Sequence, residues 1–357
     1  MKSRALLFQT ITWALAAASL GAFAQSIKIT SVPPAGAEGN IRGIVKGVDP
    51  SQYGVAVYIN VFGTWWTKPT YAEPVTPIAK NGRFTADITT GGDDACSQQV
   101  SAYVIPLTYT PPLASGQSSV PSEVVANAVA MATAYRAKGG RTIKFAGYTW
   151  EKKDTGNCVW GPGPNYFSAG QVWTDRKGLH LRISKLKGQW LCAEAMLTNS
   201  LGYGTYQFHV ASYVGGLPDP VVLGLFTYSD DPDYSHREID VEFSNGPVVG
   251  APDNWQYVVQ PYENSGQRLR FAAPGGTTNS IHEFIWSPGR VDYQSYAVGA
   301  TGQTVLFQSL AITNGVPVSG NEVVHLNLWL YNGSAPGNVK KCEVLVNDFK
   351  FTPLLGQ

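Results

Sequence analysis

The segment that decides the fold reads SHREIDVEFSN and spans residues 235–245. Every second position in its centre carries an acid: Glu238, Asp240 and Glu242. The positions between and after them are apolar: Ile239, Val241 and Phe243. Because successive side chains of a strand point to opposite faces, this alternation predicts a β-strand with three carboxylates on one face. Like charges on one face repel and acids are poor strand formers, so the arrangement costs stability and points to a functional site.

The same strand-like pattern continues on both sides of this segment. From residue 141 onward, runs such as GLHLRISKL, VVLGLFTYS and VVHLNLWLY are bounded by Gly, Pro, Asp and Asn. More than ten such runs and no convincing helix predict a large antiparallel sandwich or barrel. Residues 26–135 hold shorter runs separated by Gly, Pro and Asn-Gly turns, which predict a small, immunoglobulin-like β-sandwich. Residues 127–140 fit either a helix or a last strand that leads into a linker. We therefore expect an all-β chain with an accessory domain at 25–135 and a larger domain at 136–357.

The N-terminus has the features of a secretory signal peptide. Lys2 and Arg4 precede an apolar run that ends near residue 20, and the small residues of AFA precede Gln25. Cleavage after Ala24 is expected, so residues 1–24 would be removed. The alternative is a membrane anchor, but the run is short of the ~20 residues that span a bilayer comfortably. The predicted location is secreted or periplasmic, where disulfides persist, with no membrane insertion after cleavage.

Composition narrows the class of partner. The formal net charge is +1, which gives no reason to expect nucleic acid or an acidic membrane surface. Hydrophobic residues make up 44% of the chain and charged residues only 14%, which is ample for a core.

Four cysteines require placing: Cys96, Cys158, Cys192 and Cys342. A bond between Cys158 and Cys192 would close a loop of 34 residues (192 − 158), worth about 3–4 kcal/mol in the chain-entropy model. Cys96 and Cys342 would then be an interdomain bridge or two buried thiols, and we favour thiols. Sequence alone cannot fix the connectivity. No Cys-x-x-Cys or His-rich spacing indicates a zinc site.

The chemistry that needs crowded carboxylates is glycoside hydrolysis. One acid must be protonated to assist the leaving oxygen, and another must be ionised to attack the sugar or activate water. Crowding sorts these roles, because a carboxyl holds its proton more tightly beside a second negative charge. No organic cofactor is implied. A rival use of carboxylates is calcium binding, to which Asp230, Asp231 and Asp233 just upstream could contribute oxygen ligands. We expect no catalytic metal and keep a structural Ca²⁺ as the alternative.

At this point the chain resembles glycoside hydrolase family 16, the laminarinase and lichenase family. EIDVE matches the family signature E-[ILV]-D-[IVF]-E, and CAEAMLTNSLGYGTYQF, HEFIWSPGRVDY and LNLWLYNG are similar to further family segments. The similarity covers residues 140–355. It implies a concanavalin-like jelly-roll sandwich and supports a Cys158–Cys192 bond. It also implies that Glu238 is the nucleophile, Glu242 the general acid/base and Asp240 an assisting carboxylate.

The resemblance also suggests residues that line the sugar cleft. They are Glu194, Tyr203, Gln260, Tyr262, Asn327 and Trp329. Trp160 and Tyr166 flank the Gly/Pro-rich loop GPGPNYF, which could carry their rings outward to stack on sugars. His236 and Arg237 stand where many glucanases carry Trp, so they would either contact substrate or pair with nearby aspartates.

The function that these observations predict is a secreted, monomeric, retaining glycoside hydrolase. Its expected substrate is a polysaccharide cleaved at internal β-linkages, with β-1,3 or β-1,3-1,4 glucan first. The alternative is a catalytically silent, lectin-like carbohydrate-binding protein. A lectin has no need of a complete acid triad, so we favour the enzyme.

Overall fold

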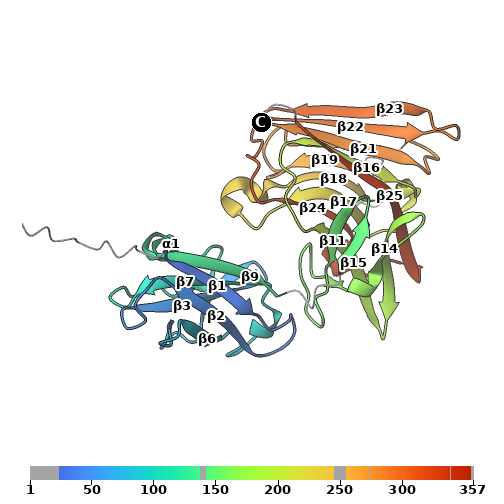
Figure 1. Ribbon diagram of the computed structural model, residues 1–357. Helices are drawn as coiled ribbons and strands as arrows, with labels where there is room; N and C mark the ends of the chain where they lie inside the picture. The colour runs from blue at the N-terminus through green and yellow to red at the C-terminus, as the bar shows by residue number, and fades with distance from the viewer. Residues whose placement is uncertain (1–23, 137–141, 245–254, 273, 338, 355–357) are drawn as a thin grey trace, which may run out of the picture.

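The computed structural model describes residues 24–136, 142–244, 255–272, 274–337 and 339–354, and its regular structure is almost entirely β. The predicted all-β class is confirmed. The predicted signal peptide lies outside the described residues, apart from Ala24. No helix among the residues described is long and apolar enough to cross a bilayer. Figure 1 shows the first part of the chain, in blue to teal, beside the larger sheet system in green to red.

Residues 24–136 form two facing antiparallel sheets. The smaller has the strand order β1-β2-β6, and the larger has the order β8-β4-β3-β7-β9 with β5 paired to β3. Their bounds are β1 Ser26–Ser31, β2 Asn40–Lys46, β3 Tyr53–Val61, β4 Thr64–Lys68, β5 Val75–Pro77, β6 Arg83–Asp87, β7 Gln99–Pro106, β8 Ser115–Gln117 and β9 Ala130–Tyr135, with η1 Asp94–Cys96 and α1 Ser122–Asn127 between strands. Of the segment 127–140, which fitted either helix or strand, Ala130–Tyr135 forms strand β9, and residues 137–140 lie outside the described residues.

The cores of this first part lie on both faces of its larger sheet. Ile41 and Phe84 of the small sheet pack against Val57 and Val104 of the large one. On the far face, Tyr58 and Tyr103 pack beneath Val124 of α1. Strand β3 is therefore buried on both sides, which explains why its sequence YGVAVYINV is nearly continuous in apolar residues.

The rest of the chain forms one long, folded-over sheet. Its strand order is β20-β19-β18-β17-β24-β15-β14-β25-β16-β21-β22-β23, with β10 to β13 attached beside β14 and β15. The bounds are β10 Thr142–Phe145, β11 Tyr148–Lys152, β12 Tyr166–Phe167, β13 Val172–Asp175, β14 Gly178–Leu186, β15 Gln189–Leu197, β16 Gly204–Val210, β17 Val221–Tyr228, β18 Ile239–Ser244, β19 Trp255–Val259, β20 Arg268–Phe271, β21 Ser280–Ser287, β22 Arg290–Val298, β23 Thr304–Ile312, β24 Val323–Leu330 and β25 Lys341–Pro353. The short 3₁₀ turns are η2 Ala169–Gln171, η3 Val214–Gly216, η4 Pro232–Arg237 and η5 Tyr331–Gly333.

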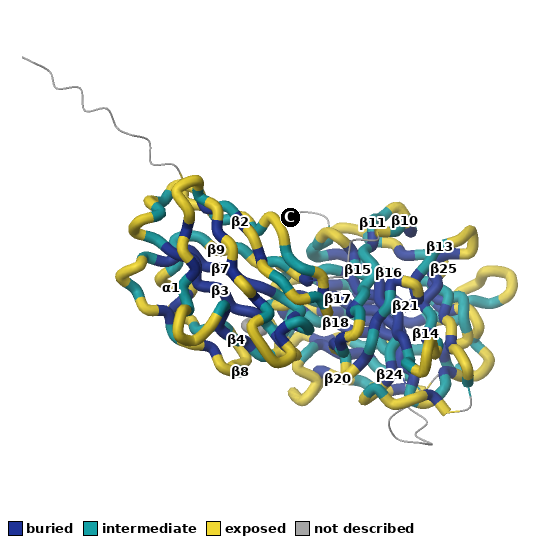
Figure 2. Tube along the Cα trace, turned by 90° about the horizontal axis from the view of Figure 1, so that it is seen from below, coloured by how far each residue is buried: buried dark blue, intermediate teal, exposed yellow. Residues whose placement is uncertain are grey.

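This sheet folds into two layers that pack face to face in a jelly-roll-like sandwich. We call β20-β19-β18-β17-β24-β15 the front layer and β14-β25-β16-β21-β22-β23 the back layer. The Tyr293 hydroxyl of β22 donates a 2.6 Å hydrogen bond across the core to the Val258 carbonyl of β19. Phe243 of β18 meets the His282 ring of β21 at a centroid distance of 4.6 Å. Figure 2 shows the resulting buried interior, in dark blue, running through β17, β18 and β21.

The inward residues of β18 belong to this core, which decides where its acids point. Ile239, Val241 and Phe243 are fully buried in the cluster between the layers. Because side chains alternate along a strand, Asp240 and Glu242 face away from the core, on the outer side of the front layer. We call this surface the carboxylate face.

Candidate active site

The three acids of the decisive segment interact with one another. Glu238 directly precedes β18, whose residues Asp240 and Glu242 follow on the same face. Glu238 and Asp240 share a side-chain hydrogen bond, and the charge of Glu242 acts on both. Strand alternation alone therefore brings the three carboxylates together on one face, and we call them the unit of three acids because their charges interact.

On the β19 side, two glutamines hold this unit. Gln256 pairs with Glu242 in register and donates a side-chain hydrogen bond to its Oε2. Gln260 donates its backbone N–H to the Glu238 carbonyl at 3.1 Å, and its side chain hydrogen-bonds Asp240. Arg270 of β20 stands behind Gln256, with Nε 3.3 Å from its Oε1. The predicted residue Gln260 is thus in direct contact with the acids.

On the β17 and β24 side, a glycine makes room for an amide. Gly224 lies across from both Glu242 and Asn327. A Cβ on Gly224 would lie 2.5 Å from Asn327 Oδ1, so any larger residue would displace this side chain. Asn327 Oδ1 is buried and has no hydrogen-bond partner among the described residues. A buried acceptor without a partner is costly, and beside Glu242 it is suited to receive a ligand hydroxyl.

Glu194 continues this row on β15, where it pairs with Asn327. Its carboxylate is 2% exposed and accepts from Lys153 Nζ at 2.7 Å, and it lies 2.8 Å from His325 Nδ1. Burial raises the pKa of Glu194, but Lys153 and His325 outweigh this and hold the pKa below its usual value. Glu194 therefore stays ionised and is occupied by two cationic or polar partners. It supports the carboxylate face and is less free to bind sugar than its prediction as a ligand implied.

Burial dominates the electrostatics of the three central acids. It raises the pKa of Glu238 to about 8, with a further increase from the Glu242 charge. Burial and both glutamates raise the pKa of Asp240 well above its usual value. Burial also raises the pKa of Glu242, although Gln256 and Arg270 oppose the shift. Three carboxyls with raised pKa values hold protons at pH values where exposed acids have lost them.

The proton of the Glu238–Asp240 pair belongs on Asp240. Asp240 is 3% exposed, and its Oδ2 has no hydrogen-bond partner among the described residues. A protonated Asp240 can donate to Glu238, which favours the ionised form of Glu238. As the pH approaches 8, Glu238 loses its proton while Asp240 keeps one, so an ionised and a protonated carboxyl stand side by side. Glycosidic cleavage likewise requires one ionised and one protonated carboxyl.

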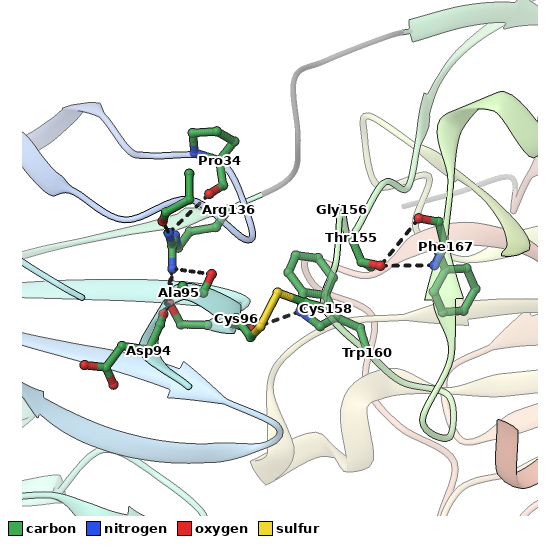
Figure 3. The surroundings of a disulfide bond; sticks show 12 residues. Pro34, Asp94, Ala95, Cys96, Arg136, Thr155, Gly156, Cys158, Trp160 and Phe167 are labelled. Carbon is green, nitrogen blue, oxygen red and sulfur yellow. Dashed lines mark hydrogen bonds between the residues drawn. A yellow bond between two sulfur atoms is a disulfide. The ribbon is translucent and has the colours of Figure 1, made fainter. Parts of the chain in front are cut away.

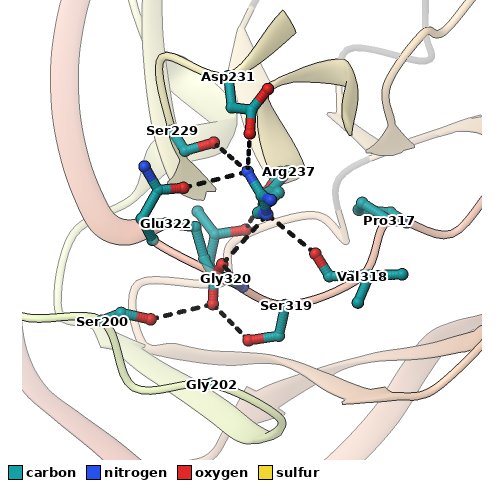
Figure 4. Close-up of polar contacts among 12 residues, drawn as sticks. Ser200, Gly202, Ser229, Asp231, Arg237, Pro317, Val318, Ser319, Gly320 and Glu322 are labelled. Carbon is teal, nitrogen blue, oxygen red and sulfur yellow. Dashed lines mark hydrogen bonds and ion pairs between the residues drawn. The ribbon is translucent and has the colours of Figure 1, made fainter. Parts of the chain in front are cut away.

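The turn that delivers Glu238 is strained. Ser235, His236 and Arg237 have φ values of 50°, 58° and 49°, a left-handed conformation that residues with a Cβ rarely adopt. Three such residues in a row persist only when their surroundings fix them. The fixing group is Arg237, which Figure 4 shows at the centre of a polar network.

Arg237 is a structural anchor, which corrects its prediction as a substrate-binding residue. It is 7% exposed, its Nε donates to the Val318 carbonyl at 2.9 Å, and its Nη1 lies 3.0 Å from Asp231 Oδ2. Nη1 also donates to Ser229 and Asn321. The guanidinium is therefore turned into the loop between β23 and β24. Pairing with an aspartate was the alternative that the sequence left open.

The His236 side chain faces Tyr228 of the carboxylate face. Its ring stacks on Tyr228 at a centroid distance of 5.1 Å and an angle of 5°, and its Nδ1 is 3.1 Å from the Ser229 carbonyl. Tyr228 follows Thr227, whose partner in β18 is Ile239, so Tyr228 stands beside Glu238. The prediction that His236 lies at the site is compatible with this position.

Two predicted aromatic ligands are structural instead. Trp160 is buried with Cys158 and Ala35, and its Nε1 donates to the Cys96 carbonyl at 3.0 Å. Tyr203 packs edge-on against Trp286 of the back layer at 5.1 Å, and its hydroxyl accepts from Ser319. Trp160 is buried and Tyr203 is half-buried in these contacts, so neither ring is brought to the row of acids.

The remaining predicted aromatics differ in their positions. Trp329 shares the carboxylate face with Asn327, two residues earlier on β24, and lies near Gly163. Tyr262 is exposed on the β19–β20 connection, where its backbone N–H bonds Gln260 and its ring lies under Arg268. Tyr166 is half-buried on β12, which pairs with β15 at Leu191. Of these three, Trp329 is brought to the row of acids.

The disulfide prediction is wrong. Cys158 bonds to Cys96, joining the two parts of the chain (Figure 3). Cys192 and Cys342 are buried free thiols. Cys192 lies in the core of the large sandwich, where its Sγ is 3.3 Å from Asn165 Oδ1. Cys158 instead sits on a loop that faces residues 35 and 36 of the first sandwich. The two cysteines that share a domain in sequence therefore point into different environments.

No protein-family model matches the chain, and no curated protein matches it. Among solved structures, the Bacillus licheniformis β-glucanase is 18% identical, with 61% of this chain and 100% of that chain covered and a TM-score of 0.43. A β-1,3-1,4-glucanase (lichenase) from a mouse hindgut metagenome is 19% identical, with 60% and 98% covered and a TM-score of 0.42. A family 16 endo-glucanase from Bacteroides ovatus is 12% identical, with 57% and 94% covered and a TM-score of 0.42.

Several residues of the carboxylate face were missed in the sequence. They are Lys153, Tyr228, Gln256, Arg270 and His325. His325 could have been found, because VVHLNLWLY alternates and places His325, Asn327 and Trp329 on one face. Gln256 and Arg270 depend on the pairing of β18 with β19 and β20, which the sequence does not state.

The aspartates of the alternative structural calcium site have other partners where they are described. Asp231 pairs with Arg237, and Asp230 hydrogen-bonds Tyr135. The side chain of Asp233 lies outside the described part of the chain. Within the described part, no group of three or more His, Cys, Asp or Glu side chains is arranged to hold a metal ion.

Proposed function

We propose that this protein is an exported, retaining glycoside hydrolase that cleaves internal β-linkages of a β-1,3 or β-1,3-1,4 glucan. The observation that carries the proposal is the unit of Glu238, Asp240 and Glu242 on one strand face, where burial raises all three pKa values and neighbouring negative charge raises those of Glu238 and Asp240 further. The family signature EIDVE supports it independently of the geometry. The apolar leader and the interdomain disulfide support export.

The proposed first step forms a covalent glycosyl-enzyme. Ionised Glu238 attacks the anomeric carbon while the glycosidic C–O bond breaks, and Glu242 gives its proton to the departing oxygen. Asp240, protonated and buried, donates to Glu238 in the free site and sets its charge. Asn327 Oδ1, which lacks a partner beside Glu242, accepts from a sugar hydroxyl.

In the second step water completes the reaction. Glu242, now ionised, takes a proton from a water molecule that attacks the anomeric carbon, and the bond to Glu238 breaks. Two displacements at one carbon restore its configuration. The chemistry uses side chains and water only.

Hydrolysis of laminarin, lichenan, agarose and carrageenan tests the activity directly. We expect reducing ends from laminarin or lichenan, with the β-anomer of the new end appearing first in the proton NMR spectrum. Glu238→Gln and Glu242→Gln should each lower kcat by about 10²–10⁴-fold. Glu123→Gln, an exposed acid on α1, is the control and should leave kcat unchanged. Absence of cleavage across all four polysaccharides would overturn the proposal.

Azide assigns the two roles. With Glu238→Ala, azide can occupy the space of the missing nucleophile and attack once, so the product is an α-glycosyl azide. With Glu242→Ala, the covalent intermediate still forms, so azide attacks second and gives a β-glycosyl azide. The opposite pair of products would exchange the two roles.

A further inference from the structure

The first sandwich touches the large one at a loop beside the carboxylate face. We call residues 153–165 the tether loop. Its Lys153 binds Glu194, and its Asn165 side chain donates to the Leu330 carbonyl at 2.8 Å. Gly163 of the same loop lies against Trp329, because a Cβ on it would be 3.6 Å from that ring. The tether loop therefore borders the row that holds Trp329 and Asn327.

The first sandwich grips this loop covalently. Cys96 bonds to Cys158, and the Cys96 carbonyl accepts from Trp160 Nε1 at 3.0 Å (Figure 3). Ala35 packs on Cys158 and Trp160. A disulfide, a hydrogen bond and an apolar contact thus act together at one point.

The part of the first sandwich that makes this contact is itself stiff. The fully buried guanidinium of Arg136 gathers two segments, the loop of residues 33–37 and the turn of residues 94–97. It donates to the carbonyls of Pro33, Pro34, Ala37, Asp94 and Ala95 and to the hydroxyl of Ser97. Cys96 lies within this clamp. The clamp therefore fixes the neighbouring residues of β9 relative to Cys96.

The residue beside the clamp reaches the acids from a second direction. Tyr135 ends β9, directly before Arg136, and its hydroxyl hydrogen-bonds Asp230 of the turn that leads to Glu238. Its interactions extend to Tyr228, which in turn interacts with Glu238. Yet Tyr135 remains 54% exposed. The hydroxyl is held, while more than half of the residue's surface is open to solvent.

We propose that Tyr135 is a substrate-binding residue supplied by the first sandwich, and that the Cys96–Cys158 bond holds it in place beside the carboxylate face. This inference rests on the proposed function and deepens it. A tyrosine ring fixed at its hydroxyl offers a flat apolar surface on which a glucose ring of a neutral glucan can stack. Because both the ring and its domain are already fixed, little entropy is lost on binding. The first sandwich is then a part of the active site instead of a separate module.

Binding to the Glu238→Gln protein tests the idea without consuming the ligand. Isothermal titration with laminarin and with lichenan measures the affinity of this protein and of versions that also carry a change at residue 135. Tyr135→Ala should weaken binding about three- to tenfold, and Tyr135→Phe, which keeps the ring but loses the hydrogen bond to Asp230, should fall between the parent and Tyr135→Ala. Met131→Ala is the matched control, since Met131 lies on the same exposed face of β9 and is 57% exposed.

A second variant tests the tether. Cys96→Ser combined with Cys158→Ser releases the first sandwich from the loop and should weaken glucan binding as much as Tyr135→Ala does. Near-ultraviolet circular dichroism and the Tm of each variant show that the fold is kept. If Tyr135→Ala binds like Met131→Ala, or if Tyr135→Phe is as weak as Tyr135→Ala, the stacking role is overturned. Parental affinity in the double serine variant would overturn the role of the bond.

The role of Tyr135 and the proposed hydrolase function can be tested separately. If the wild type hydrolyses laminarin or lichenan and Tyr135→Ala leaves affinity and product lengths unchanged, only the role of Tyr135 fails. If the wild type cleaves no glucan and the Glu238→Gln protein binds none, the proposed function itself fails.

Discussion

Arg237 Nη1 lies 3.0 Å from Asp231 Oδ2, and Arg237 directly precedes Glu238 in the chain. This ion pair closes the turn in which three consecutive residues hold positive φ values. The guanidinium also reaches the Val318 carbonyl and lies 3.9 Å from buried Glu322. The Arg237 side chain therefore joins the strained turn to the loop before β24. It thereby fixes the position of the Glu238 carboxylate.

We expect Arg237→Lys to lower kcat on laminarin by about 10–100-fold, because a lysine cannot make the forked set of contacts and Glu238 would shift. The KM should change little, since Arg237 does not face the substrate. Initial-rate kinetics separate the two quantities. Gly320→Ala should produce a milder version of the same defect, because a Cβ at Gly320 would lie 2.7 Å from Arg237 Nε.

Ser200→Ala provides the control for this network. Ser200 donates to Glu322 at 3.1 Å but does not touch Arg237, so its removal should leave kcat close to that of the wild type. A wild-type kcat in Arg237→Lys would show that the turn keeps its shape without the guanidinium.

The raised pKa of Glu238 makes the free energy of unfolding depend on pH. The pKa is 4.5 in a solvated chain and about 8 in the fold, so the folded protein binds the proton more tightly than the unfolded chain does. The stabilisation is complete below pH 4.5 and is lost as the pH rises through 8. Glu238→Gln cannot ionise, so its stability relative to the wild type should rise by about 1–3 kcal/mol between pH 5 and pH 8.

Thermal or urea unfolding at several pH values measures this difference. The exposed Glu123 on α1 supplies the control, and Glu123→Gln should track the wild type at every pH. A constant difference between Glu238→Gln and the wild type would mean that Glu238 has an ordinary pKa in the fold.

Local patterns carried most of what could be read from the sequence. The alternation in EIDVEFS placed the acids on one face and Ile239, Val241 and Phe243 in the core, because the period of a strand is a property of neighbours along the chain. The same rule applied to VVHLNLWLY would have added His325 to Asn327 and Trp329. The all-β class followed from many such runs bounded by turn residues.

Contacts between distant segments could not be read in this way. The partner of Cys158 lies 62 residues away in the other sandwich, and no local feature distinguishes it from Cys192. The burial of Trp160 could not be predicted for the same reason, because its ring is covered by the distant segment that contains Cys96. The side chain of Arg237 faces inward because three consecutive residues with positive φ values redirect the turn. The composition of the segment does not show which residues adopt positive φ values.

The corrected cysteine pairing predicts a specific pattern of thiol reactivity. Burial raises the pKa of Cys192 to about 12 and that of Cys342 to about 11, so neither forms a reactive thiolate at pH 8. We expect the native protein to resist iodoacetamide at both positions, and the unfolded, unreduced protein to be alkylated at both. Peptide mapping without reduction should yield a linked peptide containing Cys96 and Cys158.

Loss of this bond should also be measurable as stability. The 62-residue loop corresponds to about 4 kcal/mol in the chain-entropy model, which Cys158→Ser would remove. Cys192→Ala is the comparison, with an expected cost of about 1 kcal/mol and an intact bond. A linked Cys158–Cys192 peptide would contradict the arrangement described.

Glu194 supports the carboxylate face through its two partners, Lys153 and His325. Glu194→Gln leaves the partly buried Lys153 without its carboxylate, and this should cost about 3 kcal/mol of unfolding free energy at pH 7. The pKa of Glu194 is lowered in the fold, so its contribution is present above the unfolded value of 4.5 and is lost as the pH falls through the lower folded value. The difference between the variant and the wild type should therefore shrink in acid. Asp348→Asn, in an exposed pair 3.5 Å from Lys350, should change stability by less than about 0.5 kcal/mol. Equal effects of the two substitutions in urea unfolding would show that burial gives the Glu194–Lys153 pair no special weight.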